Sequence, residues 1–232
     1  MTEELKRPQV LVLLAGCGNK DGSEIHESVL TLLCLSQAGA DYQCAAPNIN
    51  QAEVLNFLDD TNLAQERNVL QEAARIARSD IKDLNTLSID DYDALMIPGG
   101  TGVAKNLCTF ATEGPECSVL PEIEKLITDA HSKKKPIGAI CIAPALVAKV
   151  LASKTDNLKL TLGTAEGPTQ ALTTMGATAK TCFSADFIFD KDNRVVSTPA
   201  YMHGDASPAD LYQGIAGCVR AVLELSVYPV AG

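Results

Sequence analysis

The sequence predicts an α/β fold with a mainly parallel sheet and helices on both faces of that sheet. Short apolar runs such as VLVLL (residues 10–14) have the composition of parallel strands that are buried on both sides. These runs alternate with longer segments whose apolar residues recur every three to four positions, as they do in amphipathic helices. The 232 residues contain no linker, low-complexity stretch or internal repeat, so we expect a single domain over residues 1–232.

The first elements alternate between strand and helix. Residues 9–15 are predicted to form a buried strand, and the glycines of 16–22 mark the loop that follows it. Residues 23–39 have helical spacing, and Gly39 ends this helix because glycine readily adopts the left-handed conformation found at helix C-termini. Residues 42–46 form the second predicted strand.

A long polar segment, 48–65, follows the second strand, and we interpret it as an insertion near one edge of the sheet. Residues 63–78 have a strong helical pattern of apolar positions. Residues 94–97 are a third buried strand, which ends at the Pro-Gly-Gly sequence of 98–100.

The second half of the chain continues the alternation. Its expected elements are a helix at 122–132, a strand at 137–140, a helix at 143–152, a strand at 159–162, a helix at 169–175 and a final helix at 209–225. A polar turn at 190–193 joins two short apolar runs, 187–189 and 195–197, into a predicted hairpin. We expect the tail, 227–232, to be loose.

The charge of the chain excludes some classes of partner. A net charge of −10 argues against a nucleic-acid surface, which needs clustered Lys and Arg, and disfavours binding to anionic membranes. No apolar run is long enough to span a bilayer, and the polar N-terminus MTEELKRPQ resembles neither a secretory signal nor an Arg-rich transit peptide. We therefore expect a cytoplasmic protein, or a mitochondrial one if a presequence has been removed.

The eight cysteines are scattered and include no CxxC pair, which makes a zinc site unexpected. Most of them should be reduced, buried and inert. The loop 98–102 lacks the Gly-Lys-Ser/Thr of a P-loop, and the glycines of 16–22 do not fit a dinucleotide fingerprint. We expect no metal and no cofactor.

Cys141 is the cysteine that departs from this pattern, because it lies where a predicted strand passes directly into a helix. Such a corner is strained, and the residues two positions away must be small, as Ala139 and Ala143 are. We expect the helix N-terminus to lower the pKa of the Cys141 thiol, and the N–H of Ile142 to be available to an oxyanion. The alternative is a packed, unreactive cysteine at a helix start.

Two further loops meet the same edge of the sheet. The N–H groups of Gly99 and Gly100 can face the pocket of Cys141, although a plain turn is the simpler interpretation. Glu24 and Glu27 begin the first long helix, where acidic residues usually form a solvated face that complements the helix dipole. If one of them is buried beside Cys141, its pKa is raised and it can exchange a proton with a substrate. Sequence spacing does not choose between the two.

Five segments together resemble a known family. They are GCGNKDGSEIHESVLTLL, ERNVLQEAARIAR, DALMIPGGTGVAKNL, GAICIAPAL and VVSTPAYM. They resemble the ElbB branch of the PfpI-type, class I glutamine amidotransferase-like superfamily, known as enhancing lycopene biosynthesis protein 2 or isoprenoid biosynthesis glyoxalase. The resemblance runs from about residue 8 to residue 226 and implies a flavodoxin-like three-layer sandwich.

The resemblance also implies roles for individual residues. Cys141 corresponds to the nucleophile of the family, Glu27 to the carboxyl beside it, and the N–H groups of Gly100 and Ile142 to an oxyanion hole. The implied activity is that of a glutathione-independent glyoxalase, a lyase or hydratase that converts 2-oxoaldehydes such as methylglyoxal to hydroxy acids. The implied partner is then a small aldehyde, and a homodimer is left open.

The sequence departs from the superfamily at one place. Members with a Cys-His pair carry the histidine just after the strand that follows the elbow helix, where this chain has Leu162-Gly163-Thr164. His203 follows a late strand and is a candidate pocket residue, with a surface loop as the simpler alternative. Two other functions therefore stay open: a redox- or electrophile-sensing or chaperone-like protein that uses Cys141, and a non-catalytic amidotransferase-like binding domain.

Overall fold

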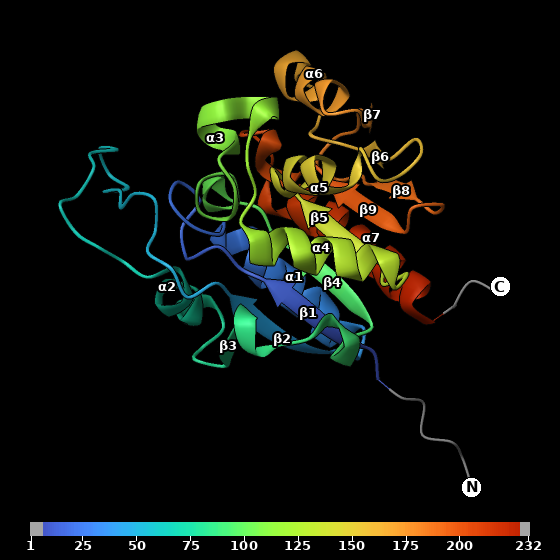
Figure 1. Cartoon of the computed structure of the whole chain (residues 1–232), viewed down its shortest axis with the longest axis horizontal. Coiled ribbons are helices and arrows are strands. Elements are labelled where there is room, and N and C mark those ends of the chain that lie inside the picture. Colours follow the sequence, from blue (N-terminus) through green and yellow to red (C-terminus); the bar gives the residue numbers. More distant parts are fainter. Residues whose placement is uncertain (1–6, 228–232) are drawn as a thin grey trace, which may run out of the picture.

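The computed structural model describes residues 7–227, and their main sheet confirms the predicted fold class (Figure 1). The strands of this sheet are β1 (Gln9–Leu13), β2 (Asp41–Ala46), β3 (Ile81–Asp83), β4 (Ala94–Ile97), β5 (Ile137–Ile140), β8 (Ile188–Asp190) and β9 (Val195–Thr198). Their order is β3-β2-β1-β4-β5-β9-β8, and each neighbouring pair is parallel except the hairpin of β8 and β9. Two short strands, β6 (Lys159–Leu160) and β7 (Thr178–Ala179), pair in a second sheet.

Helices cover both faces of the main sheet (Figure 1). They are α1 (Ile25–Gln37), α2 (Val69–Ile76), α3 (Phe110–Glu113), α4 (Pro121–Ser132), α5 (Ala143–Leu151), α6 (Glu166–Thr174) and α7 (Pro208–Val227). None of the helices within residues 7–227 is long and apolar enough to cross a membrane.

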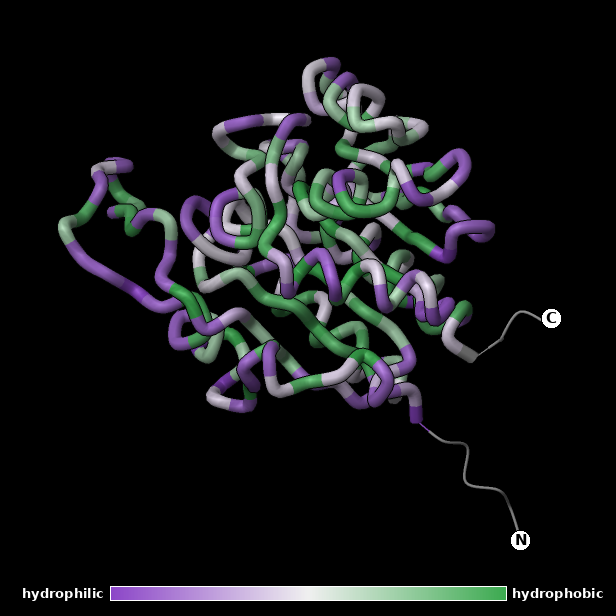
Figure 2. Tube along the Cα trace, viewed as in Figure 1, coloured by the Kyte–Doolittle hydropathy of each residue, from purple (hydrophilic) through white to green (hydrophobic). Residues whose placement is uncertain are grey.

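Side chains along β1 point alternately to the two faces of the sheet and so contribute to two separate hydrophobic cores. Val10 and Val12 pack in the cluster that includes Leu35 of α1 and side chains of α7. Leu11 and Leu13 point the other way, into the cluster formed with α4 and α5. All of these β1 side chains are fully buried, and each contributes about 1.5–3 kcal/mol to folding. Figure 2 shows the resulting concentration of hydrophobic residues along the central strands.

The strand order reverses between β1 and β4, and this reversal determines where a ligand can bind. In open parallel sheets, ligands occupy the crevice outside the carboxyl ends of the strands at such a switch point. The loops that leave this edge are 14–24 after β1, 98–102 after β4 and the corner at Cys141 after β5. The three loops singled out in the sequence therefore lie together.

The helix predicted over 63–78 is wrong at its N-terminal end, because α2 spans only Val69–Ile76. Asn68 is the N-cap of α2, and its side chain accepts a hydrogen bond from the N–H of Gln71 at 3.1 Å. The preceding residues pair instead with the polar segment: the N–H of Leu63 donates to the carbonyl of Val54 at 2.8 Å. These tertiary hydrogen bonds outweigh the helical propensity of residues 63–67.

Other differences are small. The strands β3 and β7 were not predicted, since they are two or three residues long and have no apolar run. The strand predicted at 159–162 is shorter, and α7 continues to Val227, so the rest of the predicted loose tail lies outside the described residues. The polar segment 48–65 forms part of the long connection from β2 to α2, which extends away from the sheet at the left of Figure 1.

The capping of α2 leads to a test of this boundary. Replacing Asn68→Ala removes the acceptor at the helix start and should lower the free energy of unfolding by about 1 kcal/mol, as measured by urea denaturation. Asn68→Asp keeps a capping oxygen and should retain most of that stability. Equal stability of wild type and Asn68→Ala would mean that the helix does not begin there.

Candidate active site

Cys141 occupies the strained corner between β5 and α5. Its φ is +60°, a left-handed value that is unusual for a residue other than glycine, and its N–H donates to the carbonyl of Thr198 at 2.9 Å. Ala139 and Ala143 on either side are fully buried, so larger side chains have no room there. The geometry is that of a nucleophile elbow, with the sulfur held at the N-terminus of α5.

Glu27 is the carboxyl that lies against this thiol. Its side chain is fully buried and is hydrogen-bonded to the side chain of Cys141. Two backbone N–H groups hold the carboxyl in place: Gly99 donates to Oε2 at 3.1 Å and Tyr201 donates to Oε1 at 3.2 Å. A Cβ at residue 99 would lie 2.4 Å from the Cβ of Cys141 and 2.6 Å from Oε2 of Glu27, so only glycine fits between them.

Glu24 caps the helix, whereas Glu27 contacts the thiol, a difference that the sequence spacing did not reveal. It is the N-cap of α1, and its Oε2 accepts a hydrogen bond from the N–H of Glu27 at 2.7 Å. Its own N–H donates to the carbonyl of Gly99 at 2.9 Å, which ties the start of α1 to the loop after β4. Glu24 therefore positions Glu27, and part of it also faces the cavity of Cys141.

The buried carboxyl keeps its proton to an unusually high pH. Burial and, to a smaller extent, the negative charge of Glu24 raise the pKa of Glu27 to about 8, although the N–H of Tyr201, the Cys141 side chain and the N–H of Gly99 act against them. At neutral pH, Glu27 is therefore mainly protonated.

The expected low pKa of the Cys141 thiol is not what the structure shows. Burial raises this pKa well above the ordinary value, and the adjacent Glu27 carboxyl raises it further. The N–H groups of Gly100 and Ile142 hydrogen-bond to the sulfur and lower the pKa, but they do not outweigh burial. Both the Cys141 thiol and the Glu27 carboxyl are therefore protonated in the resting site.

Those two N–H groups are the pair that the sequence resemblance assigned to an oxyanion hole. Both are directed at the sulfur of Cys141, one from the loop after β4 and one from the first turn of α5. Gly100 has a φ of +102°, and a Cβ there would lie 2.3 Å from the N atom of Glu24. The close packing of loop against helix start therefore requires glycine at this position.

A cavity of about 470 Å³ opens above Cys141. Its lining residues come from four of the loops and turns at the carboxyl edge of the sheet, and they are Asn19, Glu24, Gly100, Thr101, Ala104, Phe110, Ala111, Cys141, Ile142, Tyr201 and Met202. Sequence reasoning assigned no chemical role to Phe110 or to Tyr201, although Tyr201 lies in the segment VVSTPAYM that resembles the family. The volume suits a small molecule.

The histidines lie outside this cavity lining. His203 lines a neighbouring cavity of about 340 Å³, and its Nε2 lies 3.3 Å from the carbonyl oxygen of Cys182. A Cβ at Gly163 would lie 2.8 Å from the same Nε2, so the ring of His203 fills the space that a side chain at residue 163 would need. His26 is exposed, and its Nδ1 lies 2.9 Å from Oη of Tyr201.

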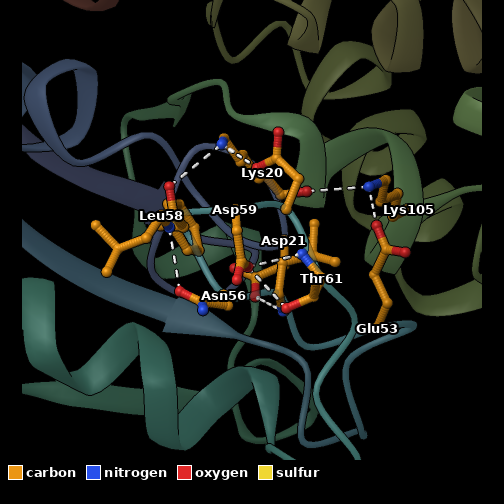
Figure 3. A network of polar contacts seen from close by, with 11 residues as sticks. Lys20, Asp21, Glu53, Asn56, Leu58, Asp59, Thr61 and Lys105 are labelled. Carbon is orange, nitrogen blue, oxygen red and sulfur yellow. Dashed lines mark hydrogen bonds and ion pairs between the residues drawn. The ribbon is translucent and has the colours of Figure 1, made fainter.

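The connection from β2 to α2 braces the loop after β1 from outside (Figure 3). Asp21 is buried, and its Oδ2 accepts a hydrogen bond from the N–H of Leu55 at 2.9 Å. Lys20 forms an ion pair with Asp60, beside the contact of Leu55 with Asp21. Because Asn19 of the braced loop lines the cavity, this connection supports one of its walls without contributing to the lining.

Residues 7–227 contain no group of three or more His, Cys, Asp or Glu side chains arranged to hold a metal ion. Around the sulfur of Cys141, the site presents the Glu27 carboxyl and two backbone N–H donors.

The amino-acid sequence of this chain is similar to those of known proteins. The human protein described as glutamine amidotransferase-like class 1 domain-containing protein 3, mitochondrial, is 40% identical over 230 residues, covering 94% of this chain and 83% of its own length. The ES1 protein homolog, mitochondrial, of Rattus norvegicus is 39% identical, covering 95% of this chain and 85% of its own length. No known family profile matches the chain.

Solved structures of related proteins have the same fold as this chain. The crystal structure of an isoprenoid biosynthesis protein with an amidotransferase-like domain from Ehrlichia chaffeensis superposes with a TM-score of 0.86 at 36% identity, covering 93% of this chain and 99% of that one. DJ-1 of Schizosaccharomyces pombe shares the fold, with a TM-score of 0.52 at 17% identity and coverage of 95% and 100%. The chain therefore belongs to the family of ES1 proteins and glutamine amidotransferase-like class 1 domain-containing proteins.

Proposed function

We propose that this protein is a glutathione-independent glyoxalase that uses Cys141 to convert small 2-oxoaldehydes, such as methylglyoxal, to 2-hydroxy acids. The observation that carries the proposal is the hydrogen-bonded pair of Glu27 and Cys141 beneath a cavity, with two N–H donors at the sulfur. A thiol can add to an aldehyde carbon, and a carboxyl with a pKa near 8 can both take up and return a proton close to neutral pH.

The first step forms a carbon–sulfur bond. The ionised carboxylate of Glu27 takes the proton of the Cys141 thiol as the sulfur attacks the aldehyde carbon and the C=O π bond breaks. The N–H groups of Gly100 and Ile142 stabilise the charge on the oxygen. Glu27 then returns the proton to that oxygen, which leaves a hemithioacetal and a carboxylate.

The second step moves hydrogen between the two substrate carbons. The Glu27 carboxylate removes the proton from the former aldehyde carbon, and the electron pair moves onto the neighbouring carbonyl to form an enediolate. Glu27 then delivers its proton to the second carbon, while the hydroxyl proton moves from the first oxygen to the second. The product is a thioester of Cys141. Water hydrolyses it by breaking the C–S bond, which returns the proton to sulfur and releases the hydroxy acid.

This mechanism needs no imidazole, which fits the glycine at position 163. We further propose that the protein belongs to the ElbB branch, with a link to isoprenoid biosynthesis, and that it acts in mitochondria. The support is the description of the Ehrlichia chaffeensis protein and the mitochondrial names of the human and rat relatives.

Substitutions at Cys141 and Glu27 test the roles of the thiol and the carboxyl separately. Cys141→Ala and Glu27→Gln should each abolish the formation of lactate from methylglyoxal, because one lacks the nucleophile and the other the proton carrier. In urea, which exposes every thiol, Glu27→Gln should still be alkylated at Cys141 by iodoacetamide, and mass spectrometry then shows that its thiol is intact. Cys182→Ala, a substitution outside the cavity, serves as the control and should keep wild-type activity. Equal rates for wild type and Cys141→Ala would rule out the mechanism.

The raised pKa of Glu27 also predicts how stability depends on pH. The unfolded chain loses this proton near pH 4.5, whereas the folded chain keeps it until about pH 8. The unfolded state therefore binds fewer protons in this window, so stability falls as the pH rises from 4.5 to 8, by about 1.4 kcal/mol per pH unit at most from this group. Glu27→Gln should lack this contribution, and urea denaturation of both proteins across the window measures the difference. Parallel pH profiles would show that Glu27 is ionised in the folded state.

A further inference from the structure

Two other cysteines lie together at the base of α3. An isolated antiparallel bridge joins Cys108 to Val119, and it is flanked by hydrogen bonds from the N–H of Thr109 to the carbonyl of Ser118 at 2.9 Å and from Leu120 to Leu107 at 3.0 Å. Because side chains alternate in extended backbone, Cys117 points to the same side as Val119 and is the diagonal neighbour of Cys108.

The side chains of these two cysteines are in contact. Each thiol lies close enough to affect the pKa of the other, and both residues are buried, with exposed fractions of 4% and 2%. The hydrogen of the Cys108 thiol is donated to the carbonyl of Val103 at 3.4 Å. Both thiols are reduced in the structure.

We propose that Cys108 and Cys117 are a reversible thiol–disulfide couple, which a hydroperoxide oxidises to an intramolecular disulfide across the base of α3. This couple is separate from the chemistry at Cys141 and does not depend on the proposed function.

A second cavity provides access to the couple. It has a volume of about 300 Å³, and its lining includes Cys108, Thr109 and Ser118. This space is large enough to admit a molecule of the size of hydrogen peroxide.

The positions of the two thiols assign them different steps: Cys108 lines the cavity and meets the peroxide, and Cys117, which does not line it, reacts second. Burial raises the pKa of Cys108 to about 12. Burial also raises the pKa of Cys117 above its ordinary value, although the ammonium of Lys149 acts against burial. Lys149 is held nearby, since its Nζ donates to the carbonyl of Pro115 at 2.9 Å.

The oxidation balances in two steps. The sulfur of Cys108 attacks one oxygen of the peroxide, the O–O bond breaks, and the thiol proton leaves with the departing hydroxide as water, so that Cys108 becomes a sulfenic acid. The sulfur of Cys117 then attacks the sulfur of Cys108, and the displaced hydroxide takes the Cys117 proton as a second water. Two thiols and one peroxide thus give one disulfide and two waters. A dithiol reductant reverses the reaction by exchange.

The disulfide would close a ring that carries part of the cavity wall. The ring spans residues 108–117, and it contains Phe110 and Ala111, which line the cavity of Cys141. Gly114 turns the chain inside it with a φ of +56°. The oxidation state of the couple is therefore linked through the backbone to part of the wall of the Cys141 cavity.

Peptide mass spectrometry tests this proposal directly. Trypsin cleaves after Lys105 and Lys125, and the peptide between them contains Cys108 and Cys117 as its only cysteines. After mild treatment with hydrogen peroxide, unfolding in urea, blocking of free thiols with iodoacetamide and digestion, this peptide should be lighter than its reduced form by two hydrogen atoms and carry no alkyl group. Dithiothreitol should restore two alkylation sites.

Controls separate the couple from nonspecific oxidation and from the proposed enzyme. The experiment is run in wild type and in Cys141→Ala, and the disulfide should form equally in both. Cys108→Ser and Cys117→Ser should each fail to form it. Cys34 and Cys218, buried thiols of α1 and α7 that influence each other electrostatically, should remain fully alkylatable. Retention of both alkylation sites in the 106–125 peptide after peroxide, or sulfinic acid at one cysteine with no loss of two hydrogens, would overturn the proposal.

Discussion

The contact between a buried carboxyl and a buried thiol is the constraint on which the rest of this site depends. A carboxyl without solvent needs partners for its oxygens, and Glu27 obtains them from the N–H groups of Gly99 and Tyr201. Each partner imposes a condition on the backbone: residue 99 must be glycine, and the turn before Tyr201 places Ala200 at a φ of +42°. The cap from Glu24 then fixes where α1 begins.

The same contact decides the electrostatics of the thiol. A helix N-terminus favours a negative charge by about 0.3–1 kcal/mol at exposed positions, whereas burial of a charged group shifts a pKa by several units. At Cys141 the second effect is the larger, and the nearby carboxyl adds to it. The thiol is therefore kept protonated in the resting state, and its reactivity depends on whether the carboxyl can take the proton. A helix dipole alone does not make this cysteine reactive.

The short segment around α3 has the cavity of Cys141 on one side and a second pair of cysteines at its base. Phe110 and Ala111 face the cavity of Cys141, while the cysteines at positions 108 and 117 meet at the base of the same segment. The segment is held by an isolated bridge rather than by a sheet, and Lys149 of α5 reaches across to it. Helix α5 thus contacts both sites, since its N-terminus meets Cys141 and its last turn carries Lys149.

The sequence by itself determined the α/β class, the strands at 94–97 and 137–140, and the sharp corner at Cys141, because each depends on local features: a continuous apolar run, or small residues around a thiol. Only the tertiary structure decided the rest. It gave Glu24 the role of the helix cap, shortened the helix predicted over 63–78, brought Tyr201 to the Glu27 carboxyl and raised the pKa of the thiol. These outcomes depend on burial and on hydrogen bonds between segments far apart in the chain, which no local pattern of residues encodes.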